Sequence, residues 1–164
     1  ICCDVYSLPQ VLDEKFDIVF TSYGTIGWLP DMDKWAEVVA HFMKPGGSFI
    51  FAEFHPVVWM FDNDLKYVQY SYFKAEPIME TESGTYADRE NEKQFSTMTW
   101  NHGIGEVFMS LRKQGLNIEV LKEYDYSPYN CLANMVETGP DEYRVAHLNG
   151  LIPLVYALKA SKPD

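Results

Sequence analysis

The sequence has few of the features that mark zinc-binding, nucleic-acid-binding or membrane proteins. It contains three cysteines, Cys2, Cys3 and Cys131, and their spacing does not match that of zinc ligands. We therefore expect reduced thiols, no metal site and a cytoplasmic location. No apolar run is long enough to cross a bilayer. Basic clusters are missing and the formal net charge is -11, so we expect neither a membrane nor nucleic acid as a partner.

Apolar and aromatic side chains are plentiful by comparison. Of the 164 residues, 47% are hydrophobic and 15% are aromatic, which excludes a disordered chain and favours a core together with a pocket. The length suits one domain, and we take residues 1–164 as a single unit. Residues 57–100 differ in pattern from the rest and are interpreted as an insertion. The number of subunits does not follow from the sequence.

Two apolar runs with a helix between them carry most of the fold prediction. Phe16–Ser22 and Ser48–Phe54 have the composition of strands that are covered on both faces. Asp31 is placed to cap a helix with an apolar stripe, and Lys44–Gly47 is expected to end it. Strand, helix and strand make a crossover unit of a parallel sheet. Ligands of such sheets bind at the carboxyl ends of the strands.

The rest of the chain extends this pattern at both ends. Ile1–Val5 is predicted as a short strand, and because the sequence starts there we expect a domain truncated at its N-terminus. The other predicted elements are a helix at Gly103–Gln114, strands at Asn117–Tyr124 and Leu154–Ala160, and a short helix at Asp141–Leu148.

Inside the insertion, Tyr67–Phe73 and Lys93–Trp100 alternate between apolar and polar residues with a period of about two. This predicts an antiparallel hairpin with one solvent-exposed face. It lies between sheet elements, where it is placed to act as a lid over a substrate. The aromatic residues of Tyr67–Phe73 either line a hydrophobic pocket or pack on the sheet.

The ordered elements resemble the second half of the class I S-adenosylmethionine-dependent methyltransferases. The resemblance rests on Phe16–Phe20, on Gly27–Asp31, on the helix ending at Lys44-Pro45-Gly46-Gly47, and on the closing helix and strands. It implies an α/β fold, Rossmann-like and doubly wound, with a mostly parallel sheet and an antiparallel closing strand. It also implies S-adenosylmethionine as cofactor and methyl transfer to a small-molecule acceptor.

Two cofactor motifs of that family are missing from this sequence. Neither the Gly-rich turn after the family's first strand nor the acidic residue ending its second strand has a counterpart, and Gly103-Ile104-Gly105 does not follow a buried strand. We therefore expect this chain alone to hold the adenine side of a cofactor site and to be inactive by itself. Two other functions stay open, a non-catalytic binding or assembly module and a Rossmann-type oxidoreductase.

The resemblance also implies a set of cofactor-binding residues. Asp4 corresponds to the carboxylate that accepts the adenine amino group, and Val5 to the backbone N–H beside the ring. The other candidates are Ser22, Tyr23 and Gly24, which pass beneath the methionine part of the cofactor, and Trp28, which walls the adenine or the substrate. The alternatives are a strand-end turn for Asp4, a helix-entry loop for residues 22–24, and core packing for Trp28.

Two histidines are the candidates for catalysis. His55 follows the second apolar run and is the leading candidate for a substrate-facing base, since the ordinary pKa of histidine is close to neutrality. His102 forms a second polar pair with Asn101. The alternatives are a loop histidine before a proline and capping of the helix near Gly103. Methyl transfer needs a base only if the acceptor must lose a proton.

Overall fold

The computed structural model describes residues 1–74, 76–83 and 94–164. Its main sheet has the strand order β1 (Phe16–Thr21), β2 (Met43–Phe54), β8 (Val155–Ser161) and β5 (Asn117–Tyr124). β1 and β2 are parallel, and β8 is antiparallel to both β2 and β5. The α/β class and the parallel pair are confirmed. The predicted antiparallel closing strand, β8, is confirmed as well. Because β8 lies between β2 and β5, the sheet is mixed and only one of its three strand pairs is parallel, fewer than a mostly parallel sheet would have.

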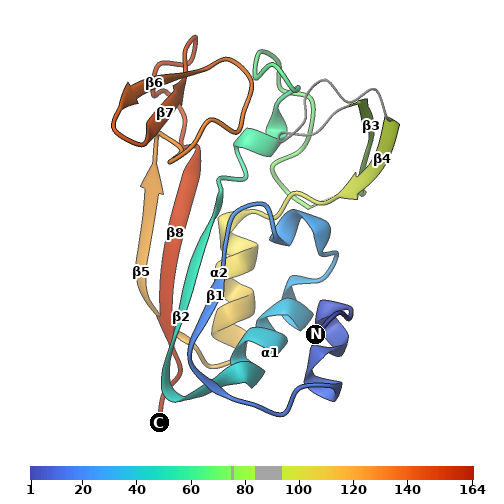
Figure 1. Cartoon of the computed structure of the whole chain (residues 1–164), viewed down its shortest axis with the longest axis vertical. Helices are drawn as coiled ribbons and strands as arrows, with labels where there is room; N and C mark the ends of the chain where they lie inside the picture. The colour runs from blue at the N-terminus through green and yellow to red at the C-terminus, as the bar shows by residue number, and fades with distance from the viewer. Residues whose placement is uncertain (75, 84–93) are drawn as a thin grey trace.

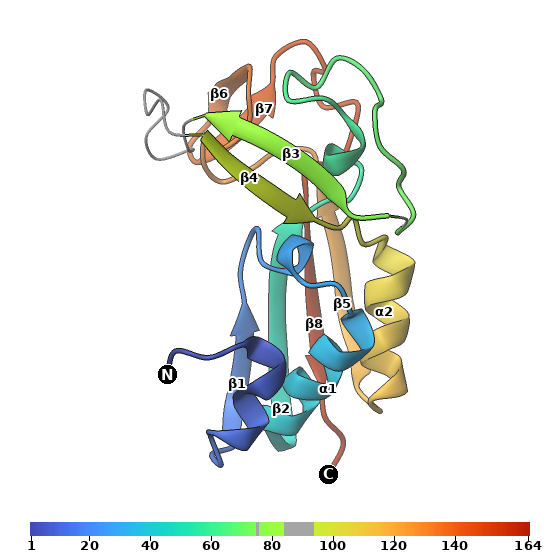
Figure 2. The ribbon, with the colours of Figure 1, turned by 90° about the vertical axis from the view of Figure 1, so that its right-hand side faces the viewer.

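Two helices, α1 (Met32–Phe42) and α2 (Ile104–Lys113), pack side by side on one face of the sheet (Figure 1; Figure 2). In a doubly wound fold helices cover both faces, which the described residues do not do. On the other face, Ile18 and Phe20 of β1 are 65% and 62% exposed. The prediction that this strand is covered on both sides is therefore wrong for this chain, although its position and direction are right.

Helix α1 forms as the sequence predicts. The Asp31 side chain accepts the Lys34 backbone N–H at 3.0 Å and so satisfies one of the free donors of the first turn. The apolar stripe of the helix faces the sheet, where the Trp35 ring lies 5.4 Å from that of Phe51. The helix ends at Phe42, just before the Lys44–Gly47 segment, and the backbone turns at Gly46 with φ +71°.

The first residues do not form the predicted strand. They lead into a 3₁₀ helix, η1 (Val5–Gln10), because the Asp4 carboxylate accepts the Tyr6 N–H at 2.8 Å and caps it. The Tyr6 hydroxyl accepts the Asp31 N–H at 3.0 Å and also lies 3.1 Å from the Asp31 carbonyl oxygen, to which it donates. These bonds fix η1 against the start of α1.

Two hairpins lie beyond the end of the sheet at which β1 and β2 finish (Figure 2). The insertion contributes β3 (Ile78–Ser83) and β4 (Gln94–Thr99), an antiparallel pair, so an antiparallel hairpin does form and its second strand lies within the predicted Lys93–Trp100. Its first strand is not Tyr67–Phe73, which makes only an isolated bridge at Val68. Most of the charged stretch between the predicted strands lies outside the described residues.

The second hairpin replaces the short helix predicted at Asp141–Leu148. It consists of β6 (Met135–Gly139) and β7 (Glu142–Val145). The intervening Gly-Pro-Asp sequence is a turn signal, and Asp141 adopts φ +55° there, outside the helical region. By contrast, α2, β5 and β8 form close to their predicted bounds. Within the described ranges, every helix is too short or too polar to pass through a membrane.

Candidate functional site

A cavity of about 520 Å³ lies at the carboxyl ends of β1 and β2. Tyr23 and Gly24 enter it from the loop after β1, and Glu53 and Phe54 from the end of β2. The parallel pairing of these strands brings their ends to one edge of the sheet. This is where the sequence predicts a ligand site, and the volume is within the range of small-molecule pockets.

Aromatic residues are the largest group in the lining, and they are Tyr23, Trp28, Phe54, Trp59, Phe61, Tyr70, Trp100 and Tyr129. The polar side chains are Glu53, Asn63, Glu80, Thr97, Thr99 and Cys131. Lysine, arginine and histidine are absent from the lining over the described residues. The cavity therefore combines apolar ring surface with negative charge.

Glu53 organises the floor of the cavity. It is 2% exposed, and its carboxylate accepts four backbone N–H groups, from Gly24, Thr25, Ile26 and Phe54, the Thr25 bond measuring 2.8 Å. Burial raises the pKa of Glu53, while these N–H groups act in the opposite direction because they stabilise the carboxylate. Four donors and no acceptor around one carboxyl group are the arrangement that an ionised side chain requires. Glu53 thus fixes the loop after β1 to the end of β2.

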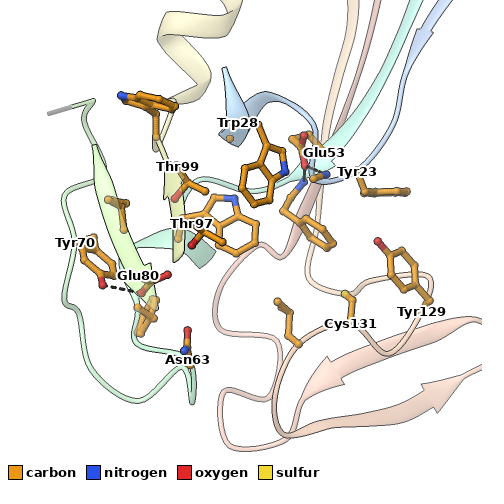
Figure 3. Close-up of a pocket in the computed structure, with 18 residues that line it drawn as sticks. Tyr23, Trp28, Glu53, Asn63, Tyr70, Glu80, Thr97, Thr99, Tyr129 and Cys131 are labelled. Carbon is orange, nitrogen blue, oxygen red and sulfur yellow. Dashed lines mark hydrogen bonds between the residues drawn. The ribbon is translucent and has the colours of Figure 1, made fainter. Parts of the chain in front are cut away.

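The β3–β4 hairpin forms one wall (Figure 3). Ile78 pairs with Thr99 and Glu80 with Thr97, and all four side chains line the cavity, since alternate residues of a strand share a face. Glu80 accepts a hydrogen bond from the Tyr70 hydroxyl at 2.7 Å. Three of these four inward side chains, those of Glu80, Thr97 and Thr99, are polar.

A backbone hydrogen bond attaches the β3–β4 hairpin to the loop that follows β1. The Trp100 N–H donates to the Gly27 carbonyl oxygen at 2.8 Å, which joins the end of β4 to the short 3₁₀ helix η2 (Ile26–Trp28). Both Trp28 and Trp100 line the cavity. The expectation that the insertion covers a ligand site therefore agrees with its position.

A group of rings surrounds Phe54. The Tyr23 and Trp59 rings each lie 5.6 Å from it and the Tyr129 ring 6.3 Å away, in tilted or edge-on arrangements. Trp59 belongs to the 3₁₀ helix η3 (Val58–Met60). Burial is the main cause that raises the pKa of Tyr23, with nearby acidic groups adding to it. These contacts hold the aromatic wall in place.

The structure brings some of the predicted cofactor residues together. Tyr23, Gly24 and Trp28 line the cavity, and Trp28 is 55% exposed, so it is not part of the core. Ser22 is the residue before them and is not in the lining. Asp4 and Val5 lie elsewhere, at the start of η1, where Asp4 serves as its cap.

Neither candidate histidine enters the cavity. The His55 Nδ1 accepts the Val57 N–H at 3.1 Å, so the ring proton is on Nε2, which lies 2.8 Å from Glu123 Oε1. Burial lowers the pKa of His55, and the bond with Glu123 partly offsets this. The His102 nitrogens face the Leu29 carbonyl oxygen and a Glu106 oxygen. This geometry supports structural roles, and a catalytic role for either histidine stays a prediction.

Asn101 also has a structural role. It is buried, and its side-chain amide donates to the carbonyl oxygens of Pro56 and Ser71, both at 3.0 Å. It does not cap α2, whose N-cap is Gly103. Asn101 instead joins the end of β2 to the segment that precedes β3.

Several lining residues were not expected as site residues from the sequence, among them Trp59, Glu80, Thr97, Thr99 and Tyr129. The alternation within Lys93–Trp100 is the signal that could have found Thr97 and Thr99, because it places them on one face. Tyr129 lies in a loop-rich region without periodicity, where the sequence carries no such signal.

Comparison with known proteins gives matches among solved structures. The chain is similar to an S-adenosylmethionine-dependent methyltransferase from Clostridium acetobutylicum (TM-score 0.56, 16% identity), covering 100% of this chain and 64% of that one. It is similar to another from Mesorhizobium loti (TM-score 0.55, 14% identity), covering 98% and 68%. The glycopeptide N-methyltransferase MtfA in complex with S-adenosylmethionine also matches (TM-score 0.55, 14% identity), covering 99% and 59%.

No protein-family model matches the sequence, and no curated protein does either. The structural likenesses show that this chain has the fold of the class I S-adenosylmethionine-dependent methyltransferases. The chain spans 64% of the length of the Clostridium acetobutylicum protein and 59% of that of MtfA.

Proposed function

We propose that this chain is part of an S-adenosylmethionine-dependent methyltransferase that acts on a small-molecule acceptor. The observation that carries the proposal is the cavity at the joined carboxyl ends of β1 and β2, walled by an inserted hairpin. In this fold that edge of the sheet is the ligand edge. The cavity volume of about 520 Å³ favours a small molecule over a polymer as the acceptor.

The residues present fit part of the cofactor. S-adenosylmethionine, when bound, supplies a methyl group activated on a positively charged sulfur. A lining of aromatic faces and carboxylates, with no basic side chain among its described residues, suits such a cation. We further propose that Tyr23 and Gly24 contact its methionine part and that Asp4 and Val5 contact adenine. The exposed Asp4 carboxylate accepts one hydrogen bond, from the Tyr6 N–H, which leaves acceptor capacity for an amino group.

The chain's own contribution to catalysis would be positioning. Aligning two reactants in a closed site is worth roughly 7–11 kcal/mol, and it needs no catalytic triad or metal. The Glu53-bound loop and the aromatic group around Phe54 hold the floor and one wall rigid, while the β3–β4 hairpin limits access of water.

Calorimetry with S-adenosylhomocysteine on the full-length protein tests this function. We expect saturable binding to one site, weakened by Asp4→Asn, which keeps one oxygen for the cap on Tyr6 but removes the carboxylate. Asp13→Asn is the matched control, because Asp13 is exposed and carries the same charge. Absence of binding to the wild-type protein would contradict the proposal and favour a non-catalytic module.

A further inference from the structure

We propose that the acceptor taken by this cavity is an apolar molecule that carries a protonated amine. The inference rests on the proposed function, since it names the class of molecule that the same site accepts. It is argued from the charge of the lining, from the hydrogen bonds of its two carboxylates, and from the ring surface around them.

The charge of the described lining disfavours an anionic acceptor. Two carboxylates, those of Glu53 and Glu80, belong to the cavity wall, and the described lining offers no basic side chain to pair with an acidic ligand. A carboxylate or phosphate on the acceptor would therefore lose its hydration without gaining an opposite charge. A protonated amine would also lose hydration, but it would gain an opposite charge in exchange.

The two carboxylates differ in how many further hydrogen bonds they can accept. Glu53 accepts four backbone N–H groups, so its oxygens are already used. Glu80 accepts the Tyr70 hydroxyl through Oε1, and a carboxylate has about four lone-pair sites in all. Glu80 is thus the group that can accept N–H bonds from a ligand. Figure 3 shows it on the hairpin, across the cavity from Tyr23 and Tyr129.

The ring surface strengthens this preference. Tryptophan is the best side chain for attracting a cation to a ring face, and Trp28 and Trp59 line the cavity with 55% and 39% of their surface exposed. The remaining lining is large enough and apolar enough to take a ring or a short alkyl body. Thr97, which pairs with Glu80 across the hairpin, adds a hydroxyl beside the carboxylate.

The test uses three probes of similar shape on the full-length protein with S-adenosylhomocysteine present, measured by tryptophan fluorescence and calorimetry. The probes are 2-phenylethylamine, 2-phenylethanol and 3-phenylpropanoate. We expect the amine to bind about tenfold more tightly than the alcohol, and the acid to bind most weakly. Equal or tighter binding of the acid would overturn the inference.

Variants test which residues cause the preference for the amine. Glu80→Gln should weaken amine binding about tenfold while it leaves alcohol binding unchanged, and Glu37→Gln, an exposed site on α1 with the same charge change, should alter neither. Trp28→Leu, at an exposed ring, should lower amine affinity more than alcohol affinity and serves if Glu80→Gln does not fold. Unchanged amine binding in these variants would overturn the inference.

If S-adenosylhomocysteine binds but the amine shows no preference, the inference fails and the proposed function stands. If the amine preference holds without S-adenosylhomocysteine binding, the proposed function fails, and only the preference of the cavity for an amine ligand remains.

Discussion

Glu53 shows how one side chain can determine the shape of a binding site. Its carboxylate accepts hydrogen bonds from the N–H groups of three consecutive residues after β1 and of its own neighbour, and these bonds satisfy the backbone donors of the loop at the cavity floor. An exposed carboxylate at the same place would leave these donors to water. The burial of Glu53 is therefore part of how the site is built.

Replacing Glu53 by glutamine should destabilise the protein by about 2–3 kcal/mol, because an amide brings one acceptor oxygen and two donors to a place that holds only donors. The loop at Gly24 should also loosen. Urea unfolding gives the first effect and hydrogen exchange of the Gly24–Ile26 amides the second. An unchanged exchange rate at these amides would contradict the role given to Glu53.

His55 gives the protein a pH dependence of known sign. Burial lowers the pKa of His55 in the folded state below its ordinary value of about 6.5, so the unfolded chain takes up the proton first as the pH falls. The stability that neutral His55 contributes is thus complete above about pH 6.5 and is lost as the pH drops toward the folded-state pKa. Urea unfolding at pH 8, 6.5 and 5 should show this decline, and His55→Gln should reduce it. An equal decline in both proteins would be inconsistent with this assignment.

Among the elements, η1 packs against α1 and is also joined to its start by the hydrogen bonds of one hydroxyl. The Tyr6 hydroxyl is bonded to both the N–H and the carbonyl group of Asp31. Tyr6→Phe should cost about 1–2 kcal/mol of stability, because it leaves both groups without this partner. Limited proteolysis should then cut within residues 5–10 sooner than in the wild-type protein. Equal resistance would mean that packing alone holds η1.

Elements with strong local signals could be predicted from the sequence, and those that depend on distant partners could not. The cap at Asp31, the stripe of α1 and the apolar run of β1 all carry their signal within one turn or strand. Ile1–Val5 has strand-like residues, yet Asp4 captures the Tyr6 N–H and no described strand lies beside it for pairing. Which strands are antiparallel depends on the order of the whole sheet.

In the candidate site, too, the residues with a local sequence signal could be predicted and those placed by distant contacts could not. Tyr23 and Gly24 were found because they follow a strand whose direction the crossover pattern fixes. His55 also follows such a strand, but its side chain turns toward Glu123 on β5, and nothing in the local sequence reports that contact. Trp59 and Tyr129 reach the cavity from segments that only the tertiary fold brings together.

Over the described residues, helices cover one face of the main sheet and leave the other face largely bare. Ile18 and Phe20 project from the bare face of β1, and exposed apolar surface of this kind binds hydrophobic dyes. The 164-residue chain should therefore enhance the fluorescence of 8-anilinonaphthalene-1-sulfonate, and Ile18→Thr with Phe20→Thr should reduce that signal. Threonine keeps the strand propensity, so the unfolding midpoint should change little. Equal dye binding by both proteins would contradict the exposure of this face.

The central claim is that the ends of β1 and β2 form the place where cofactor and acceptor meet. A crystal structure of the full-length protein with S-adenosylhomocysteine tests it most directly. We predict the sulfur beside the Tyr23–Gly24 loop, at the mouth of the cavity that Glu53 and the β3–β4 hairpin enclose. A ligand bound at the opposite edge of the sheet, or on the bare face of β1, would contradict the account.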